Sequence, residues 1–306
     1  MQGKIIKGVA GQYLVYVEQE GLFDCKAKGI FRKENEKPMV GDLVEIDRLP
    51  EEGDKDIPVG NIVKILPRKN SLIRPAVSNI DQALVIFSIT NPKPNYILLD
   101  RFLIYMARMQ VDCNIIFSKE DLDEEEELQE IMKHYANSGA GVYSCSVKLE
   151  KGIDEIRKLL KGKTSTVAGP SGVGKSSLIN ILQKDIVMEV GEISEKIDRG
   201  KHTTRHSQLI TLDESTFILD TPGFSSLELF DVTEENLASY YPEFEPFEAE
   251  CRFTCCTHLH EPVCGVKTAL EAGKISKLRY SNYCTIYQQL KDLRETAGRG
   301  KKFVKK

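Results

Sequence analysis

Long apolar runs are missing from this sequence of 306 residues, and so are internal repeats. Without such a run the chain is not expected to span a membrane. The segment 1–8 also lacks the apolar stretch of a secretory signal, so we expect a cytoplasmic protein. Charged residues make up 29% and hydrophobic residues 41%, which is ordinary for a globular protein, and this length favours two or three domains.

The net charge of -4 is small, but charge is unevenly distributed along the chain. An acidic block at 123–127 is expected to be a solvated surface. The C-terminal residues form a basic tail suited to contact with phosphates, namely Arg299, Lys301, Lys302, Lys305 and Lys306.

Eight cysteines in a cytoplasmic chain are not expected to form disulfides. Cys25, Cys113 and Cys145 lie in apolar or strand-like contexts and read as small buried hydrophobes. Cys284 stands apart in a helix-like stretch. The remaining four crowd together with two histidines, which indicates a metal site.

Residues 1–67 contain about five short β-rich runs separated by Gly, Pro and charged residues, with no long helix. This pattern predicts a small all-β barrel of the OB type, although an SH3-like barrel would give a similar pattern. The segment 68–75 reads as a linker, and its basic residues Arg68, Lys69 and Arg74 are candidates for RNA contact or ordinary surface charge.

From 68 to 227 strand-like and helix-like segments alternate, which predicts an α/β domain with a mostly parallel sheet. The continuous apolar run 83–89 is typical of a strand buried on both faces. From 228 to 306 short helical pieces surround the Cys/His cluster and lead to a helix at about 276–296, which predicts a mainly α domain.

A phosphate-binding loop follows the strand-like run 164–168 and precedes a helix opening. It fits the pattern Gly-x-x-x-x-Gly-Lys-Ser, and we expect its backbone amides to surround phosphate oxygens. Lys175 should reach the β- and γ-phosphates, and Ser176 should bind Mg²⁺. The nucleotide-binding residues expected here are Gly169, Pro170, Ser171, Gly172, Val173, Gly174, Lys175, Ser176 and Ser177.

Asp220-Thr221-Pro222-Gly223 ends a later apolar strand, 45 residues after Lys175, an interval usual in GTPases. Asp220 could face the metal ion, and the Gly223 amide could meet the γ-phosphate. Between these motifs lies a polar loop, 198–206. We expect Thr204, rather than the neighbouring Thr203, to add its hydroxyl to the Mg²⁺ site and make the loop sense the γ-phosphate.

The base is indicated by Ser118-Lys119-Glu120-Asp121, which follows a buried strand. Guanine presents two adjacent donors that the carboxylate of Asp121 could accept together, and Lys119 could lie across the base. Ser118 departs from the Asn or Thr usual in this motif. Ser146-Val147-Lys148 could supply a second contact, with the amides of Val147 and Lys148 facing guanine O6.

In ordinary GTPases the base-reading motifs follow the phosphate motifs, whereas here Asp121 and Ser146 precede Lys175 and Asp220. A circular permutation would explain this order without a change of fold. Several features of the sequence occur together in one known family: this motif order, the phosphate loop, Gly200 to Thr204, Asp220 to Phe224 and the metal cluster. In these features the chain resembles the circularly permuted GTPases of bacterial small-ribosomal-subunit biogenesis, the RsgA, YjeQ or YloQ family. The resemblance implies an OB domain, a permuted GTPase, a zinc domain and GTP-dependent action on the small subunit and its rRNA during late maturation.

Cys251, Cys256, His258 and Cys264 supply three thiolates and one imidazole, a closed set that suits tetrahedral structural Zn²⁺. The spacing resembles the zinc pattern of the family. Cys255 and His260 remain alternative ligands. Such a site would stabilise a small domain and would not take part in chemistry.

Phe224 occupies the position where many GTPases carry a water-orienting Gln, so we expect slow hydrolysis of GTP to GDP that the ribosomal subunit accelerates. His202 is a candidate for positioning the water, or for touching RNA. With Lys175 and Thr204 it completes the expected catalytic set.

Two other functions remain as alternatives to a ribosome-assembly GTPase. One is a P-loop ATPase or small-molecule kinase, and the other is an RNA-binding module that uses the nucleotide only as a structural ligand. We expect a monomer because the expected partner is the ribosome.

Overall fold

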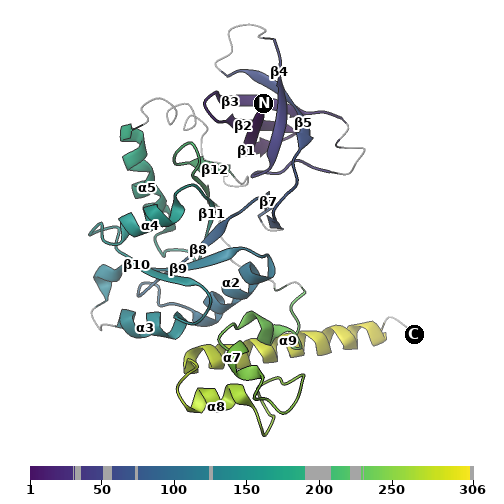
Figure 1. The fold of residues 1–306 in the computed structure, drawn as a ribbon, viewed down its shortest axis with the longest axis vertical. Helices are drawn as coiled ribbons and strands as arrows, with labels where there is room; N and C mark the ends of the chain where they lie inside the picture. The colour runs from purple at the N-terminus through teal and green to yellow at the C-terminus, as the bar shows by residue number, and fades with distance from the viewer. Residues whose placement is uncertain are drawn as a thin grey trace. The chain divides into compact units, whose positions relative to one another are not determined.

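The fold is described from a computed structural model, which covers residues 1–29, 31, 36–50, 57–72, 75–123, 127–189, 208–220, 229 and 231–303. The chain divides into two compact units. The first comprises Met1–Ile86 and Ser146–Phe224, and the second comprises Phe87–Cys145 and Ser225–Lys306. Figure 1 shows the helices and strands of both units.

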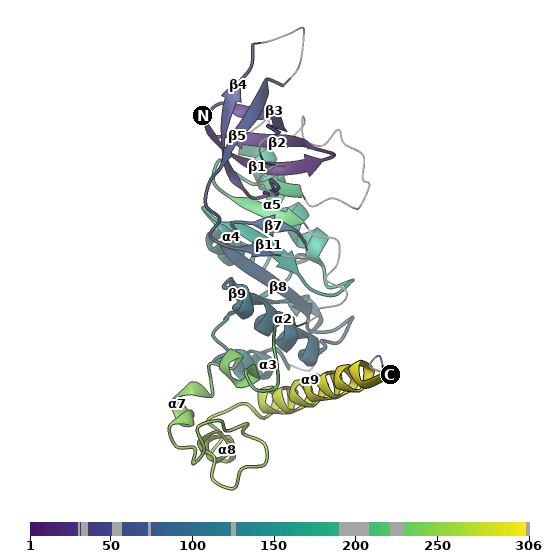
Figure 2. The same cartoon turned by 90° about the vertical axis from the view of Figure 1, so that its right-hand side faces the viewer.

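The first unit begins with a barrel of five strands (Figure 2). They are β1 (Gln2–Val9), β2 (Gln12–Val17), β3 (Gly21–Ala27), β4 (Leu43–Arg48) and β5 (Val59–Ile65). Hydrogen bonds follow the ring β1-β2-β3-β5-β4 and close it through a β1–β4 pairing, with only β3 and β5 parallel. Alternate side chains fill the interior, among them Ile5, Val15, Phe23, Val44 and Ile62. The predicted all-β barrel is therefore confirmed.

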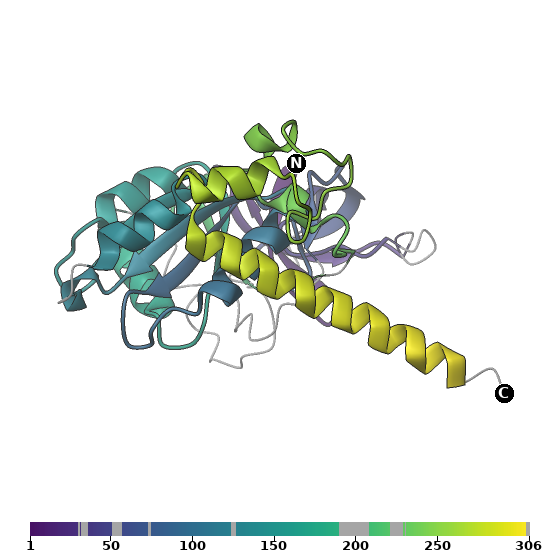
Figure 3. The same cartoon turned by 90° about the horizontal axis from the view of Figure 1, so that it is seen from below.

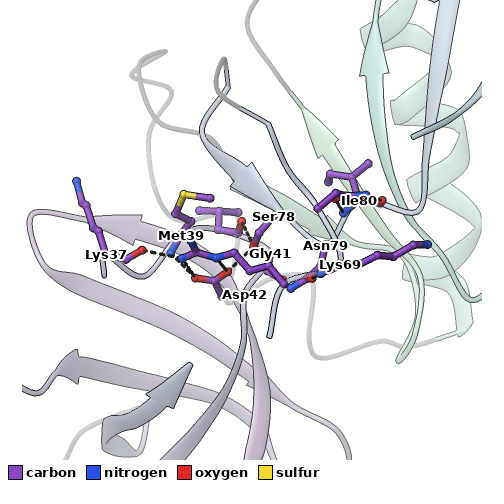
Figure 4. A network of polar contacts seen from close by, with 11 residues as sticks. Lys37, Met39, Gly41, Asp42, Lys69, Ser78, Asn79 and Ile80 are labelled. Carbon is purple, nitrogen blue, oxygen red and sulfur yellow. Dashed lines mark hydrogen bonds and ion pairs between the residues drawn. The ribbon is translucent and has the colours of Figure 1, made fainter. Parts of the chain in front are cut away.

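A buried carboxylate joins the barrel to the segment that follows it (Figure 4). Asp42 accepts hydrogen bonds from the Met39 amide at 2.7 Å and the Ser78 hydroxyl at 2.5 Å. The Arg68 guanidinium donates to both of its oxygens, at 2.7 and 2.8 Å. Gly41 has φ +91°, and a Cβ there would lie 2.0 Å from the Ser78 carbonyl oxygen, so this close approach requires glycine.

Two of the three basic residues considered for RNA contact form ion pairs with carboxylates in the structure. Arg68 donates to Asp42 and to the Lys37 carbonyl, so it has a structural role in the connection between the barrel and the segment that follows it. Lys69 forms an exposed ion pair with Asp81 at 3.2 Å. Arg74 lies outside the described residues. The expected linker also contributes part of a small hairpin, β6 (Ser71–Leu72) with β7 (Val77–Ser78).

The sheet of the first unit continues from the barrel. Its further strands are β8 (Gln82–Ser88), β11 (Thr164–Ala168), β12 (Gln208–Thr211) and β13 (Phe217–Asp220). Strand β11 runs parallel to β8 and β13, whereas β12 is antiparallel to β13 and touches β1 through the pair Lys7↔Gln208. Helices α4 (Ile153–Leu160) and α5 (Lys175–Glu189) belong to this unit. Every residue of β8 is buried, as its apolar run predicted.

The second unit contains parallel strands β9 (Asp112–Ser118) and β10 (Gly141–Cys145). Within this unit the Ile89 amide donates to the carbonyl of Ser118, the last residue of β9, at 3.1 Å. The helical segments are α2 (Tyr96–Arg108), η1 (Glu120–Leu122) and α3 (Glu127–Tyr135). Asp123 caps α3 by accepting from the amides of Glu127 and Leu128.

The C-terminal part of the second unit is helical. It contains η2 (Leu237–Tyr240), α7 (Glu245–Glu248), α8 (Gly265–Glu271) and α9 (Lys277–Phe303), the long helix of Figure 3. The helix α9 continues beyond the predicted end at about 296 and reaches Phe303. One apolar cluster joins this part to α2, since Ile104 packs with Leu237, Phe244 and Tyr283.

None of the described helices is both long and apolar enough to span a bilayer.

Candidate nucleotide site and metal centre

The predicted phosphate-binding loop lies between the strand β11 and the helix α5. Gly169, its first residue, has φ +140°, and a Cβ at this position would lie 2.1 Å from the Ile86 carbonyl oxygen. Only glycine allows the loop to pass so close to β8. The loop ends where α5 begins at Lys175, so the amides of the first helical turn face the position expected for phosphate.

The ammonium of Lys175 is folded back onto its own loop. Its Nζ donates to the carbonyl oxygens of Gly169 at 2.9 Å and Pro170 at 2.5 Å. Ser176 and Ser177 follow it on the first turn of α5, with exposed side chains. The loop thus concentrates one cation and the positive end of a helix, an arrangement that attracts an anion.

Asp220 is the last residue of β13, which runs parallel to β11. Because parallel strands point the same way, Asp220 and the phosphate loop lie at the same edge of the sheet. The side chain of Asp220 lies outside the described part of the structure. So do His202, Thr203, Thr204, Gly223 and Phe224, whose expected roles stay predictions.

The predicted base-reading segment begins at the buried end of β9. Its hydroxyl-bearing residue, Ser118, donates to the Phe87 carbonyl at 3.4 Å. Lys119 has φ +60°, a left-handed conformation that turns the chain sharply out of the strand. The Lys119 ammonium donates to the Asn91 carbonyl oxygen, in the segment that follows β8. Asp121 is half-buried in the short helix η1.

A contact beside Asp121 was not predicted from the sequence. The Ser144 hydroxyl, near the end of β10, donates to Oε2 of Glu120 at 3.0 Å. This hydrogen bond ties the segment that carries Asp121 to the neighbouring strand. No motif pointed to it, because Glu120 occupies the variable position of the Ser-Lys-Glu-Asp pattern.

The second predicted base contact forms a tight loop in the first unit. Ser146 and Lys151 exchange two backbone hydrogen bonds, each 3.0 Å long. The Ser146 hydroxyl oxygen accepts a bond from the Leu149 amide at 3.1 Å. Val147 and Lys148 therefore lie within a closed, stiff loop. The residues of this loop and of the phosphate loop belong to the first unit, and those from Ser118 to Asp121 belong to the second.

The four predicted zinc ligands converge. The donor atoms of Cys251, Cys256, His258 and Cys264 all lie within 4.8 Å of one another. Nδ1 of His258 is 3.4 Å from the Cys264 sulfur and 3.7 Å from the Cys251 sulfur, and the two sulfurs are 3.9 Å apart. A tetrahedron with zinc–sulfur bonds of about 2.3 Å has edges of roughly 3.8 Å. The cluster therefore fits a zinc ion, whereas the alternative ligands Cys255 and His260 are exposed.

The surroundings of His258 favour metal binding by the cluster. Burial lowers the pKa of His258, which favours the neutral imidazole that binds metals. Its other ring nitrogen, Nε2, faces Oε1 of Glu248 at 3.7 Å. At Glu261 burial raises the pKa, but hydrogen bonds from the Thr257 amide and its neighbours outweigh burial and lower the pKa to about 2.

The sequence was compared with known families and proteins. The model of the RsgA GTPase family matches residues 65–230, and that of the RsgA N-terminal domain matches residues 2–54. The chain belongs to the RsgA family. A relative from Agathobacter rectalis, named small ribosomal subunit biogenesis GTPase RsgA, is 54% identical over 302 residues, which cover 95% of this chain and 99% of the relative.

Two solved structures of RsgA type share the fold. The crystal structure of YloQ, described as a circularly permuted GTPase, aligns with a TM-score of 0.78 at 37% identity and covers 95% of each chain. YjeQ from Thermotoga maritima aligns with a TM-score of 0.78 at 34% identity, covering 94% of this chain and 98% of that one. The permuted GTPase fold expected from the motif order is thereby confirmed.

Proposed function

We propose that this chain hydrolyses GTP to GDP and phosphate during late maturation of the small ribosomal subunit, slowly alone and faster when bound to the subunit. The observation that carries the proposal is the geometry of the phosphate loop, in which Gly169 passes against β8 and Lys175 opens α5. The names of RsgA relatives supply the ribosomal context. Small-subunit rRNA is the proposed contact, the protein acts as a monomer, and its place is the cytoplasm, where subunits assemble.

The phosphate half of the site would bind and orient the triphosphate. Lys175 would leave its loop carbonyls and donate to the β- and γ-phosphates, while loop amides from Gly169 to Ser177 surround the phosphate oxygens. Ser176, Thr204 and Asp220 would hold Mg²⁺, which neutralises charge on the β- and γ-phosphates when bound. The amide of Gly223 would meet the γ-phosphate.

The base half would select guanine. Asp121 would accept from guanine N1–H and N2–H₂, which adenine lacks, with Lys119 across the ring plane and Ser118 supporting the turn. Ser146 would hold the loop in which the amides of Val147 and Lys148 face guanine O6. Because Glu120 is tied to Ser144, the segment that carries Asp121 is held in place before nucleotide binds.

Slow turnover without a partner would follow from Phe224, whose ring cannot orient the attacking water. His202 is the residue proposed to do so once the subunit orders its loop. We assign residues 1–67 to the barrel that contacts RNA, 68–227 to the permuted GTPase domain and 228–306 to the zinc domain. A zinc ion at Cys251, Cys256, His258 and Cys264 would stabilise that last domain when bound.

Nucleotide selectivity tests the proposal. Steady-state hydrolysis of GTP, ATP and XTP is measured for the wild type, Asp121→Asn and Lys175→Ala. We expect the wild type to hydrolyse GTP in preference to ATP. Asn at 121 accepts one bond and donates one, so it should favour xanthine, which carries a carbonyl where guanine has an amino group. Lys175→Ala should lose about 100-fold or more in rate. Equal use of ATP and GTP would instead support a P-loop ATPase or kinase.

A further inference from the structure

The loop between Cys256 and Glu261, which we call the ligand loop, carries two of the four metal ligands in an unusual backbone conformation. His258 has φ +61°, in the left-handed region that costs a non-glycine residue roughly 1–2 kcal/mol. The ligand loop has no regular secondary structure to hold this conformation. Contacts from elsewhere must therefore stabilise it.

A single carboxylate supplies most of these contacts. Oε1 of Glu261 accepts from the amide and the hydroxyl of Thr257, at 2.6 and 2.8 Å. Oε2 accepts from the amides of Leu259 and His260, at 3.0 and 3.1 Å. The four donors surround His258 in the chain, so Glu261 fixes the backbone on both sides of this ligand.

The helix α9 holds the carbonyl side of the same loop. The Tyr283 hydroxyl donates to the Thr257 carbonyl at 2.7 Å, and the Tyr280 hydroxyl donates to the His258 carbonyl at 2.6 Å. Tyr283 is fully buried in the apolar cluster that contains Cys264. Glu261 therefore accepts hydrogen bonds from the amides of the ligand loop, and the two tyrosines donate hydrogen bonds to its carbonyls.

We propose that Glu261 is a positioning residue for the metal centre: together with Tyr280 and Tyr283 it holds Cys256 and His258 in their metal-binding arrangement, although it is not itself a ligand. A closed site pays for ordering its ligands when the metal binds, and a loop already held in shape reduces that cost. This role is independent of nucleotide binding and does not rest on the proposed function.

Metal affinity of the full chain tests the role. Zn²⁺ is removed with a chelator and returned in competition with a chromophoric chelator, for the wild type and Glu261→Gln. Gln keeps the shape, but its amide group would place N–H donors against the loop's own N–H groups. We expect zinc affinity to fall about 10- to 100-fold, the range found when groups that orient metal ligands are changed.

Matched variants separate this role from a loss of folding. Glu271→Gln removes an exposed carboxylate from the nearby helix α8 and should leave zinc affinity unchanged. Tyr280→Phe removes one hydroxyl and should weaken zinc binding less than Glu261→Gln. With saturating Zn²⁺ the thermal midpoint of Glu261→Gln should return close to that of the wild type. If Glu261→Gln lowers the thermal midpoint with and without Zn²⁺ alike and leaves zinc affinity within twofold of the wild type, the proposal is wrong.

Discussion

Arg279 on α9 forms a buried ion pair with Asp100 on α2, with 2.6 Å between Nη1 and Oδ1. The exposed fractions of the two side chains are 1% and 0%. The same guanidinium donates to Glu243 at 2.7 Å and lies over the Tyr241 ring, 4.5 Å from its centroid. One cation therefore joins α9 to α2 and to the segment that carries Tyr241 and Glu243.

Removing this cation should be strongly destabilising. Arg279→Met introduces an apolar side chain of similar length and leaves the buried carboxylates of Asp100 and Glu243 without their cation. The free energy of unfolding should fall by about 3–5 kcal/mol. Urea unfolding measures it. Arg157→Met on α4, which breaks an exposed pair with Asp154, is the control and should cost about 0–1 kcal/mol. Equal effects of the two substitutions would show that the buried pair contributes no more than a surface pair.

The hydrogen bond between Glu120 and Ser144 should affect nucleotide affinity. Glu120→Ala removes a bond worth about 0.5–1.5 kcal/mol, so GDP should bind roughly twofold to tenfold more weakly because the segment with Asp121 is less ordered. Calorimetric titration with GDP measures the change. Ser144→Ala should match it, and the double variant should add little. Additive losses would argue that the two residues act separately.

Zinc removal should loosen α2 as well as the helices α8 and α9 near the four ligands. Cys264 packs in the same apolar cluster as Ile104 on α2, so a disordered metal centre removes support from that helix. Hydrogen exchange after chelation should show faster exchange in 96–108 and 265–290, with the barrel strands unchanged. Exchange that stays unchanged in 96–108 would show that the zinc region unfolds independently.

Asp213, in the turn between β12 and β13, should give a pH-dependent contribution to stability. Burial raises its pKa, but hydrogen bonds from Thr216 and Ser215 outweigh burial and lower the pKa below 3.8, its ordinary value. A lowered folded pKa stabilises the fold above 3.8, and this contribution is lost as the pH falls through the folded value. At neutral pH Asp213→Asn should have a lower urea midpoint than the wild type, and the difference should shrink below pH 3.8. A difference that is constant with pH would contradict this account.

Patterns of neighbouring residues in the sequence predicted several structural features of this protein. The run 83–89 predicted a buried strand because seven consecutive apolar or small residues are typical of a strand covered on both faces in an α/β sheet. The phosphate loop and the metal cluster were predicted because fixed spacing brings their own residues together. Both lie where the sequence placed them.

Long-range pairs could not be predicted in the same way. The sequence left Arg68 open between RNA contact and surface charge, and its pairing with the buried Asp42 was not predicted. Nothing near Arg279 in the sequence indicates that its partner is Asp100 on α2. Such pairs depend on which elements pack together, and composition and spacing do not encode that packing. The compact units show the same limit, since the segment Phe87–Cys145 groups with the C-terminal helices.

Turnover on the ribosome is the most direct test of the central claim. GTP hydrolysis by the purified full chain is measured alone, with small ribosomal subunits and with large ones, with Lys175→Ala as the blank. We expect slow hydrolysis alone, a strong rise with small subunits and no comparable rise with large ones. A rate that small subunits leave unchanged would contradict the central claim.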